Sequence, residues 1–310
     1  MTDPRPSLTG GKGSVVPRAE PRSYYDQPVI KPPVWTWEIP WYLFAGGMAG
    51  ASSVVAVAAD AIGDRGLARA ARRIAGAGAV VSPVLLISDL GRPSRFHHML
   101  RVLKPTSPMS VGSWILAGYG PAAVGSALLG ELGWFPRLRR VADAVAALRG
   151  PPLATYTGAL LANTAVPVWH AARHELPAVF AAGSVASAGA AGAVLRPNDP
   201  VAHRLALIGG VAEIAAARTM EQRLGEIGAP YHEGRSGRLT TAAKGLTAAG
   251  TALLALGGRR RKAASVAGAG LVLAGMASER WAVFTAGFAS ARDPKATVGP
   301  QRARLERDSE

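Results

Sequence analysis

Three residues with groups able to exchange protons lie at the ends of long apolar stretches, or inside one, in this sequence. Glu38 stands among tryptophans in the segment Trp35–Tyr42. Asp89 follows an apolar run and precedes Arg92 by three positions, and Tyr156 lies within another apolar run. Carboxyl and phenol groups are common participants in general acid–base chemistry. We therefore take Glu38, Asp89 and Tyr156 as the candidate proton-handling residues.

Each of these features also has a plainer interpretation. Tryptophans at the edge of a membrane form an aromatic belt, and an Asp89–Arg92 pair is common at an ordinary helix end. The aromatic belt does not explain a carboxylate among the tryptophans, and a carboxylate there can take up a proton from a bound quinol. A quinone is the oxidised form of such a quinol. We expect residues in these segments and at a later helix end to bind it: Trp37, Tyr42, Arg92, His97 and His170.

Ionisable residues also interrupt the later apolar stretches, at Glu213, Lys244 and the adjacent pair Glu279 and Arg280. A charge at the bilayer centre costs about 2.5–3.5 kcal/mol on insertion scales. We expect Glu213, Glu279 and Arg280 to face the protein interior. A structural interhelix pair and a proton path both remain open for them, whereas Lys244 lies near a helix end, from which it can reach the membrane surface.

The composition places these residues in a membrane protein. The 310 residues are 49% hydrophobic and only 18% charged, yet the net charge is +15, so apolar and basic residues are segregated. The mean hydropathy of +0.16 argues against disorder, and the long apolar runs argue against a nucleic-acid-binding protein. The chain has no cysteine, which excludes disulfides, zinc–thiolate sites and iron–sulfur clusters held by this chain. The six histidines lie near expected loops or helix ends, so we expect no haem or metal.

The length of the uncharged stretches predicts the number of membrane spans. A bilayer core of about 30 Å requires about 20 apolar residues in a helix. Four uncharged stretches meet this length, and four shorter ones are interpreted as further spans beside them: 39–59, 111–130, 150–172 and 176–195, then 74–88, 205–217, 246–258 and 263–278. The sequence therefore predicts an all-α integral membrane protein with about eight transmembrane helices.

An even number of spans places both termini on one side of the membrane, which we call the first side. Residues 1–38 form a polar, proline-rich tail without the apolar region of a signal peptide, and residues 292–310 form a second polar tail. The loops expected on the second side hold 14 Lys or Arg residues against nine on the first. The positive-inside rule then predicts that both termini are extracytoplasmic in a multi-pass protein of the plasma or inner membrane.

Five segments in order resemble the NrfD/PsrC family, the membrane subunits of polysulfide-reductase-like molybdenum oxidoreductases. They are 37–50, 89–96, 107–114, 156–161 and 290–295. The resemblance extends from about Val34 to Arg304. It implies two four-helix bundles, 39–172 with a quinone site and 173–291, and no metal held by this chain. It also implies a partner with ferredoxin-like iron–sulfur clusters and a molybdopterin catalytic subunit.

The resemblance assigns the tyrosine that faces the quinone to Tyr156. This assignment conflicts with the predicted topology, which starts the fourth span on the second side, whereas Glu38 and Asp89 lie on the first. Either Tyr156 reaches a shared pocket through its depth in the membrane, or the assignment is wrong.

The leading hypothesis is a quinone-reactive subunit, without catalysis of its own, that passes electrons between partner iron–sulfur clusters and menaquinone or ubiquinone. A passive anchor for a soluble enzyme and a small-solute or proton transporter are the alternatives. Transporters tend to contain inverted repeats, and no such repeat is evident. A pocket near Glu38 and Asp89 would favour the quinone hypothesis.

Overall fold

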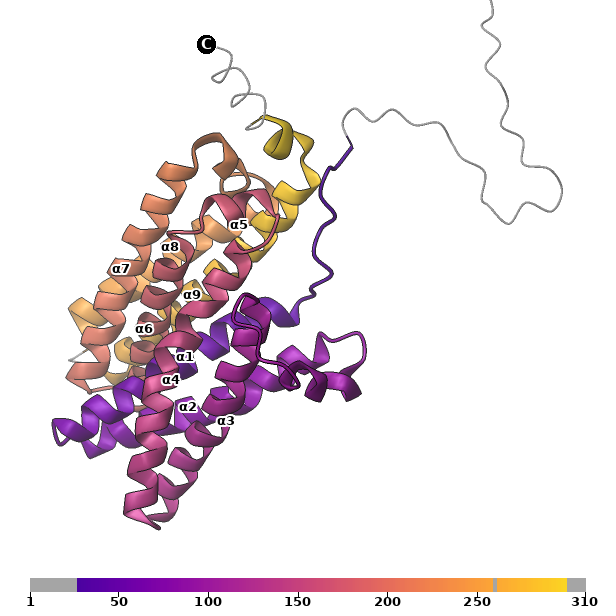
Figure 1. The fold of residues 1–310 in the computed structure, drawn as a ribbon. Coiled ribbons are helices and arrows are strands. Elements are labelled where there is room, and N and C mark those ends of the chain that lie inside the picture. Colours follow the sequence, from indigo (N-terminus) through magenta and orange to yellow (C-terminus); the bar gives the residue numbers. More distant parts are fainter. Residues whose placement is uncertain (1–26, 259–260, 300–310) are drawn as a thin grey trace, which may run out of the picture.

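The computed structural model describes residues 27–258 and 261–299, and every regular element within them is helical (Figure 1). The eight long helices are α1 (Glu38–Ala61), α2 (Arg65–Ser88), α3 (Pro108–Leu132), α4 (Pro136–Ala162), α6 (Leu176–Leu195), α7 (Pro200–Leu224), α8 (Gly234–Leu253) and α9 (Lys262–Arg292). Short helical segments connect them: η1 (Pro93–Leu100), α5 (Pro167–Ala171), η2 (Gly225–Tyr231) and the π turn η3 (Leu254–Gly258). Most of both predicted tails, together with Arg259 and Arg260, lies outside the described residues.

Six of these helices are long and apolar enough to cross a membrane, judged by length and composition. They are α1, α2, α3, α6, α7 with η2, and α8 with η3. Of the other two long helices, α4 begins with a half rich in arginine, and α9 carries Glu279 and Arg280 near its middle. The prediction of an all-α membrane protein is confirmed, although fewer than eight helices meet the criterion for a span.

Residues suited to a helix N-terminus stand at the start of several helices: side chains that accept from the free backbone amides, and prolines. The Asp64 side chain accepts a hydrogen bond from the Leu67 amide at the start of α2, at 2.9 Å. Asp199 does the same for the Val201 and Ala202 amides at the start of α7, at 3.0 Å each. Proline occupies the first position of α3, α4 and α7, where its missing amide hydrogen costs nothing.

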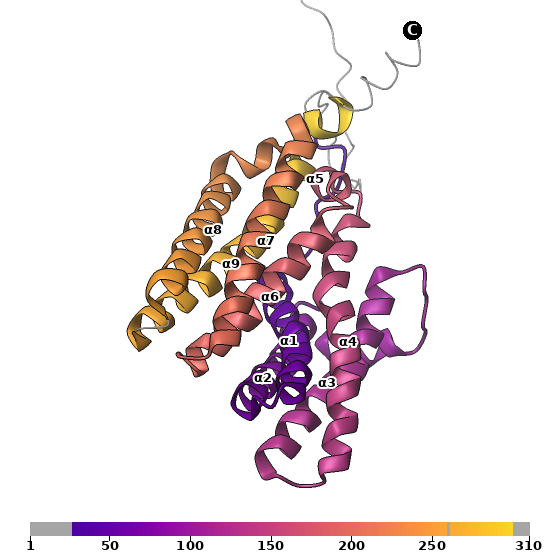
Figure 2. The ribbon, with the colours of Figure 1, turned by 90° about the vertical axis from the view of Figure 1, so that its left-hand side faces the viewer.

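The long helices form two groups. Helices α1–α4, the N-terminal group, pack in the sequence α1–α2–α3–α4 and back to α1, and helices α6–α9, the C-terminal group, also pack together. Helix α6 joins the groups because it contacts both α1 and α4. In both views α5 and the C-terminal end of α9 lie at one end of the molecule, and the turn between α3 and α4 lies at the other (Figures 1 and 2).

The predicted boundaries of the fourth helix are wrong, and the second helix extends well beyond its apolar stretch. Helix α4 spans Pro136–Ala162, not 150–172, because it continues through two internal prolines and ends at Asn163. Helix α2 begins at Arg65, nine residues before the predicted run from 74. Many arginines assigned to second-side loops therefore lie within helices. Among them Arg72 is only 6% exposed.

Candidate functional site

A cavity of about 70 Å³ lies between the ends of the four helices of the N-terminal group. Because α1 begins, α2 ends, α3 begins and α4 ends at the same level, short parts of all four helices converge there. Its polar lining comes from Tyr42, Asp89, Ser113 and Tyr156. The remaining lining is apolar: Trp35, Ile39, Leu43, Leu86, Leu90, Met99, Met109, Leu160 and Leu161.

Tyr156 meets Tyr42 in this cavity. The hydroxyl groups of Tyr42 on α1 and Tyr156 on α4 form a hydrogen bond in which either oxygen is able to donate. The observed boundaries of α4 place Tyr156 within its last two turns, at the end of the molecule where α1 begins. This resolves the conflict over Tyr156, because the fourth helix was predicted to start, not to end, near this residue.

Thr36 connects the two candidate carboxyl groups. Its amide and its hydroxyl both donate to Oδ1 of Asp89, at 2.9 and 2.7 Å, and its hydroxyl also contacts the carboxyl of Glu38. A threonine hydroxyl has one hydrogen to donate but also accepts hydrogen bonds. Both hydroxyl contacts are therefore satisfied together only when one of the two carboxyl groups carries a proton. The chain from Glu38 through Thr36 to Asp89 thus has the chemistry of a proton relay that ends in the cavity.

The apolar lining and the few polar groups fit a quinone ring. Leu86, Leu90 and Met99 provide an apolar surface for a flat ring, and such walls around a few placed polar groups are typical of cofactor pockets. One tyrosine hydroxyl donates to the other, so the pair offers one free hydrogen suited to a carbonyl oxygen. Asp89 is an acceptor suited to the hydroxyl of the reduced form. Trp35 completes one wall and stacks on the buried Trp169, with 5.8 Å between the ring centroids.

The structure brings together some of the residues predicted for the site and leaves others apart. Tyr42, Asp89 and Tyr156 line the cavity, and Glu38 reaches it through Thr36. Trp37 is 57% exposed. Arg92 and His97 lie on the exposed surface at η1.

His170 belongs to the short helix α5, away from the cavity lining. Its Nδ1 lies 3.2 Å from the carbonyl oxygen of Ala162, so it closes the break after α4. Within the described residues, no group of three or more histidine and carboxylate side chains is placed to hold a metal ion.

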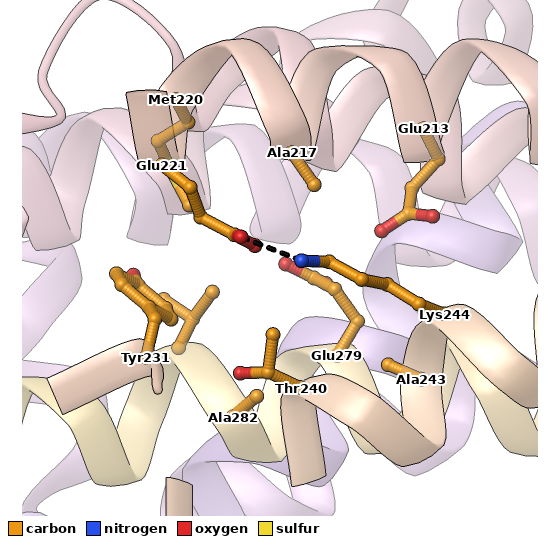
Figure 3. Close-up of a pocket in the computed structure, with 11 residues that line it drawn as sticks. Glu213, Ala217, Met220, Glu221, Tyr231, Thr240, Ala243, Lys244, Glu279 and Ala282 are labelled. Carbon is orange, nitrogen blue, oxygen red and sulfur yellow. Dashed lines mark hydrogen bonds and ion pairs between the residues drawn. The ribbon is translucent and has the colours of Figure 1, made fainter. Parts of the chain in front are cut away.

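A second polar centre lies in the C-terminal group, around a cavity of about 20 Å³ (Figure 3). Lys244 on α8 forms an ion pair with Glu221 on α7, at 2.5 Å. Glu279 pairs with its neighbour Arg280 on α9. Glu213 on α7 is only 3% exposed. The expectation that the charges at 213, 279 and 280 avoid lipid is confirmed.

The second centre is tied to α6 through Arg280. Its Nη2 donates to the carbonyl oxygen of Phe180 at 3.0 Å, and its guanidinium carbon lies 3.9 Å from the centroid of the Phe180 ring. A cation over an aromatic face is stabilising, and more so when water is excluded.

A buried ion network at the opposite end of the N-terminal group was not anticipated. Arg72 on α2 binds Asp143 on α4, with Nε to Oδ1 at 3.0 Å, and also contacts Asp60 at the end of α1. Arg139 binds both carboxylates, at 2.9 Å for Asp60 and 2.8 Å for Asp143. Ser126 on α3 donates to Asp143, so the network joins all four helices. The sequence signal was present for Asp143, which is an acidic residue amid basic ones.

Two comparisons with known proteins complete the description. Residues 24–291 match the family model NrfD_2, which is described as polysulfide reductase. A comparison with curated proteins finds no match. The family match covers all eight long helices except the last residue of α9.

Proposed function

Because this chain belongs to the NrfD-type polysulfide reductase family, we propose that it acts as the quinone-reactive membrane subunit of a multi-subunit oxidoreductase. It passes electrons between the iron–sulfur clusters of a partner subunit and a membrane quinone, either menaquinone or ubiquinone. The reaction of the whole complex takes place partly on a molybdopterin subunit, so this chain is not an enzyme by itself.

One observation carries the proposal. A single cavity between α1, α2, α3 and α4 joins a pair of tyrosine hydroxyls with a carboxylate, and that carboxylate is bridged by Thr36 to a second one. A passive anchor has no need of convergent polar groups from four helices. We therefore do not favour the anchor.

In the proposed reaction, the residues of the cavity have different roles. When bound, the quinone supplies the two-electron redox chemistry, and the protein supplies orientation, proton transfer and exclusion of water. Of the Tyr42–Tyr156 pair, one hydroxyl donates to the other, and the second hydroxyl donates to one oxygen of the ring. Asp89 exchanges a proton at the ring's hydroxyl position, and Thr36 passes that proton to or from Glu38 at the surface.

The exposed segment around η1 suits the docking of the iron–sulfur partner. It contains the basic residues Arg92, Arg95 and Arg101, and the exposed apolar side chains of Phe96 and Val102. Met99 of the same segment lines the cavity, so a partner that covers η1 lies directly beside the quinone. The proposal places the complex in the plasma or inner membrane, with this docking face and both termini on the extracytoplasmic side.

Paired tyrosine substitutions test the site. Tyr156→Phe removes one cavity hydroxyl, whereas Tyr119→Phe removes a buried hydroxyl of α3 that binds Ser53 at 2.8 Å and does not line the cavity. Hydrogen bonds to charged groups contribute about 1.5–3 kcal/mol. We expect Tyr156→Phe to lower quinone-linked turnover of the intact complex roughly tenfold or more, and Tyr119→Phe to leave it nearly unchanged. Equal turnover in the two variants would contradict the assignment of the site.

A further inference from the structure

The polar centre of the C-terminal group contains more acidic than basic side chains. Three carboxyl groups face or adjoin the small cavity, and two cations accompany them: Glu213 and Glu221 on α7 and Glu279 on α9, with Lys244 on α8 and Arg280 on α9. The remaining titratable group facing them is Tyr231 of η2. If every group were ionised, this buried cluster would carry one negative charge in excess.

The pairing of these groups identifies where that excess lies. Arg280 forms an ion pair with Glu279 and donates a hydrogen bond to the Phe180 carbonyl, and Lys244 forms an ion pair with Glu221. Within the described residues, Glu213 makes no hydrogen bond or ion pair, although it is 3% exposed. A buried carboxylate without a partner is very costly in a medium of low polarity. Among the three carboxyl groups, Glu213 is therefore the one on which a bound proton would remove the largest cost.

We propose that Glu213 is the binding site of an exchangeable proton, and that movement of the Lys244 ammonium between Glu221 and Glu213 lets protons pass through the C-terminal group. This activity goes beyond the reaction at the quinone cavity. It assigns the second polar centre a transport role that a structural interhelix pair does not have.

The geometry permits this movement. Glu213 and Glu221 lie on the same helix, eight residues or about 12 Å of helix rise apart, and both point toward Lys244 on the facing helix (Figure 3). The stem of Lys244 passes below the carboxyl of Glu213, and its ammonium reaches Glu221 (Figure 3). Lysine carries its charge on a flexible four-carbon stem, so a change of rotamers moves that charge along α7.

The exchange is balanced in protons and charge. When the Lys244 ammonium moves to Glu213, the proton of Glu213 leaves toward the end of the molecule that holds the α8–α9 turn. Glu221 has then lost its cation, and it takes up one proton from the opposite end. When Lys244 returns, the proton of Glu221 passes to Glu213. One cycle carries one proton across, and the cluster regains its initial state.

Buried polar atoms that lack a hydrogen-bond partner lie along the proposed route of the proton. Tyr231 Oη and Glu279 Oε1 line the cavity and have no hydrogen-bond partner among the described residues. A cavity of about 20 Å³ is large enough for one water molecule, which would supply one link between Glu221 and Glu213. Towards the α8–α9 turn, two further buried atoms lack partners, Thr247 Oγ1 on α8 and His203 Nδ1 on α7. His203 binds Ser265 of α9 through its other ring nitrogen, at 2.8 Å.

The resting proton is measurable without any turnover. The infrared spectrum of the full-length chain in lipid discs should contain the carbonyl band of a protonated carboxylic acid, which Glu213→Gln removes and Glu213→Asp shifts. Lys244→Met should add a second such band, because Glu221 loses its cation. The matched control is Glu226→Gln, which replaces an exposed carboxylate of η2 and should change no such band. Band intensity that does not fall in Glu213→Gln, or does not grow in Lys244→Met, overturns the proposal.

The transport step is tested in the intact complex, sealed in phosphatidylcholine vesicles and supplied with a short-chain quinol. Glu213→Gln should keep quinone-linked turnover and lose net proton translocation per electron, while Glu226→Gln keeps both. An unchanged proton-to-electron ratio in Glu213→Gln, or no translocation by the unmodified complex, overturns the step. The coupling rests on the proposed quinone reaction, but the infrared measurement does not. Absent turnover in the unmodified complex would count against the quinone site, and the infrared bands would still decide the state of Glu213.

Discussion

Thr36 couples two carboxyl groups that come from different parts of the chain. Glu38 opens α1 and Asp89 follows α2, and the single hydroxyl of Thr36 contacts both. A relay built on one hydroxyl depends on that group's ability to donate and accept at the same time. The behaviour of the site therefore depends as much on Thr36 as on the carboxyl groups.

Substitutions at Thr36 should separate the relay from simple packing. Thr36→Val keeps the shape of the side chain and removes the hydroxyl, and Thr36→Ser keeps the hydroxyl. We expect Val at 36 to lower quinone-linked turnover of the assembled complex, toward the loss expected for Glu38→Gln, which is about 10²–10⁴-fold for a proton-transfer group. Serine should restore most of it. Similar rates for the valine and serine variants would argue that Thr36 only packs.

At this scale the sequence predicted some of the cavity and not the rest. Tyr42, Asp89 and Tyr156 are polar groups in apolar surroundings, a pattern that is visible without a structure. Thr36 and Met99 have types that are ordinary in any interfacial segment, so nothing marked them. His97 was included for its proximity in sequence, but η1 turns it to the surface.

Helix α4 shows why the element boundaries were harder to predict than the elements themselves. The prediction of 150–172 rested on the uncharged stretch that follows Arg149. The helix instead continues through Pro151 and Pro152, where Gly150 packs against Gly50 of α1 and the chain remains helical. Tertiary contacts thus outweighed the local signal, and the shift of the boundary is what brings Tyr156 to the cavity.

The contact between Gly50 and Gly150 should fix the spacing of α1 and α4. A methyl group at Gly50 would lie 2.4 Å from the Gly150 carbonyl oxygen, and this backbone has little freedom to withdraw. We expect Gly50→Ala to destabilise the protein by about 1–3 kcal/mol, as overpacked cores generally do. Gly125→Ala in α3, where the methyl group meets open space, is the control. Thermal unfolding in detergent measures both, and an equal midpoint for the two variants would contradict this account.

The ion network of α1, α2 and α4 should stabilise the end of the N-terminal group that lies opposite the cavity. Asp143→Asn leaves Arg72 buried with one carboxylate fewer, and removing one partner of a buried pair costs about 3–5 kcal/mol. The control is Glu131→Gln, which breaks an exposed pair with Arg73 in which the two side chains are 38% and 55% exposed. Exposed pairs contribute about 0–1 kcal/mol. A loss of thermal stability that is no larger for Asp143→Asn than for Glu131→Gln would contradict the structural role of the network.

The whole molecule separates two polar centres that lie in different helix groups. The cavity of Tyr42, Asp89 and Tyr156 belongs to α1–α4, and the charged cluster of Glu213 belongs to α7–α9. Helix α6 contacts both groups, and its Phe180 carbonyl oxygen accepts a hydrogen bond from Arg280 of the cluster. Composition and apolar run lengths were sufficient to predict a helical membrane protein. The pairing of Lys244 with Glu221 depends on how α7 and α8 face each other, which run lengths do not encode.

The topology predicts the accessibility of introduced cysteines, in a chain that has none of its own. Lys31 is exposed before α1, and Ile62 is 68% exposed in the turn between α1 and α2. An impermeant thiol reagent added to intact cells should label Lys31→Cys and not Ile62→Cys, and inverted vesicles should give the opposite pattern. Labelling of both from one side would contradict a membrane span at α1.

Photoaffinity labelling with an azidoquinone tests the central claim most directly, because it reports where the quinone binds independently of turnover. After illumination of the intact complex, peptide mass spectrometry should find the label on residues that line the cavity of the N-terminal group, such as Met99, Met109 and Leu160. An excess of unlabelled quinone should prevent it. Competable label found only on α6–α9, or only on the lipid-facing groove beside Trp41 and Leu273, would contradict the assignment of the quinone to this cavity.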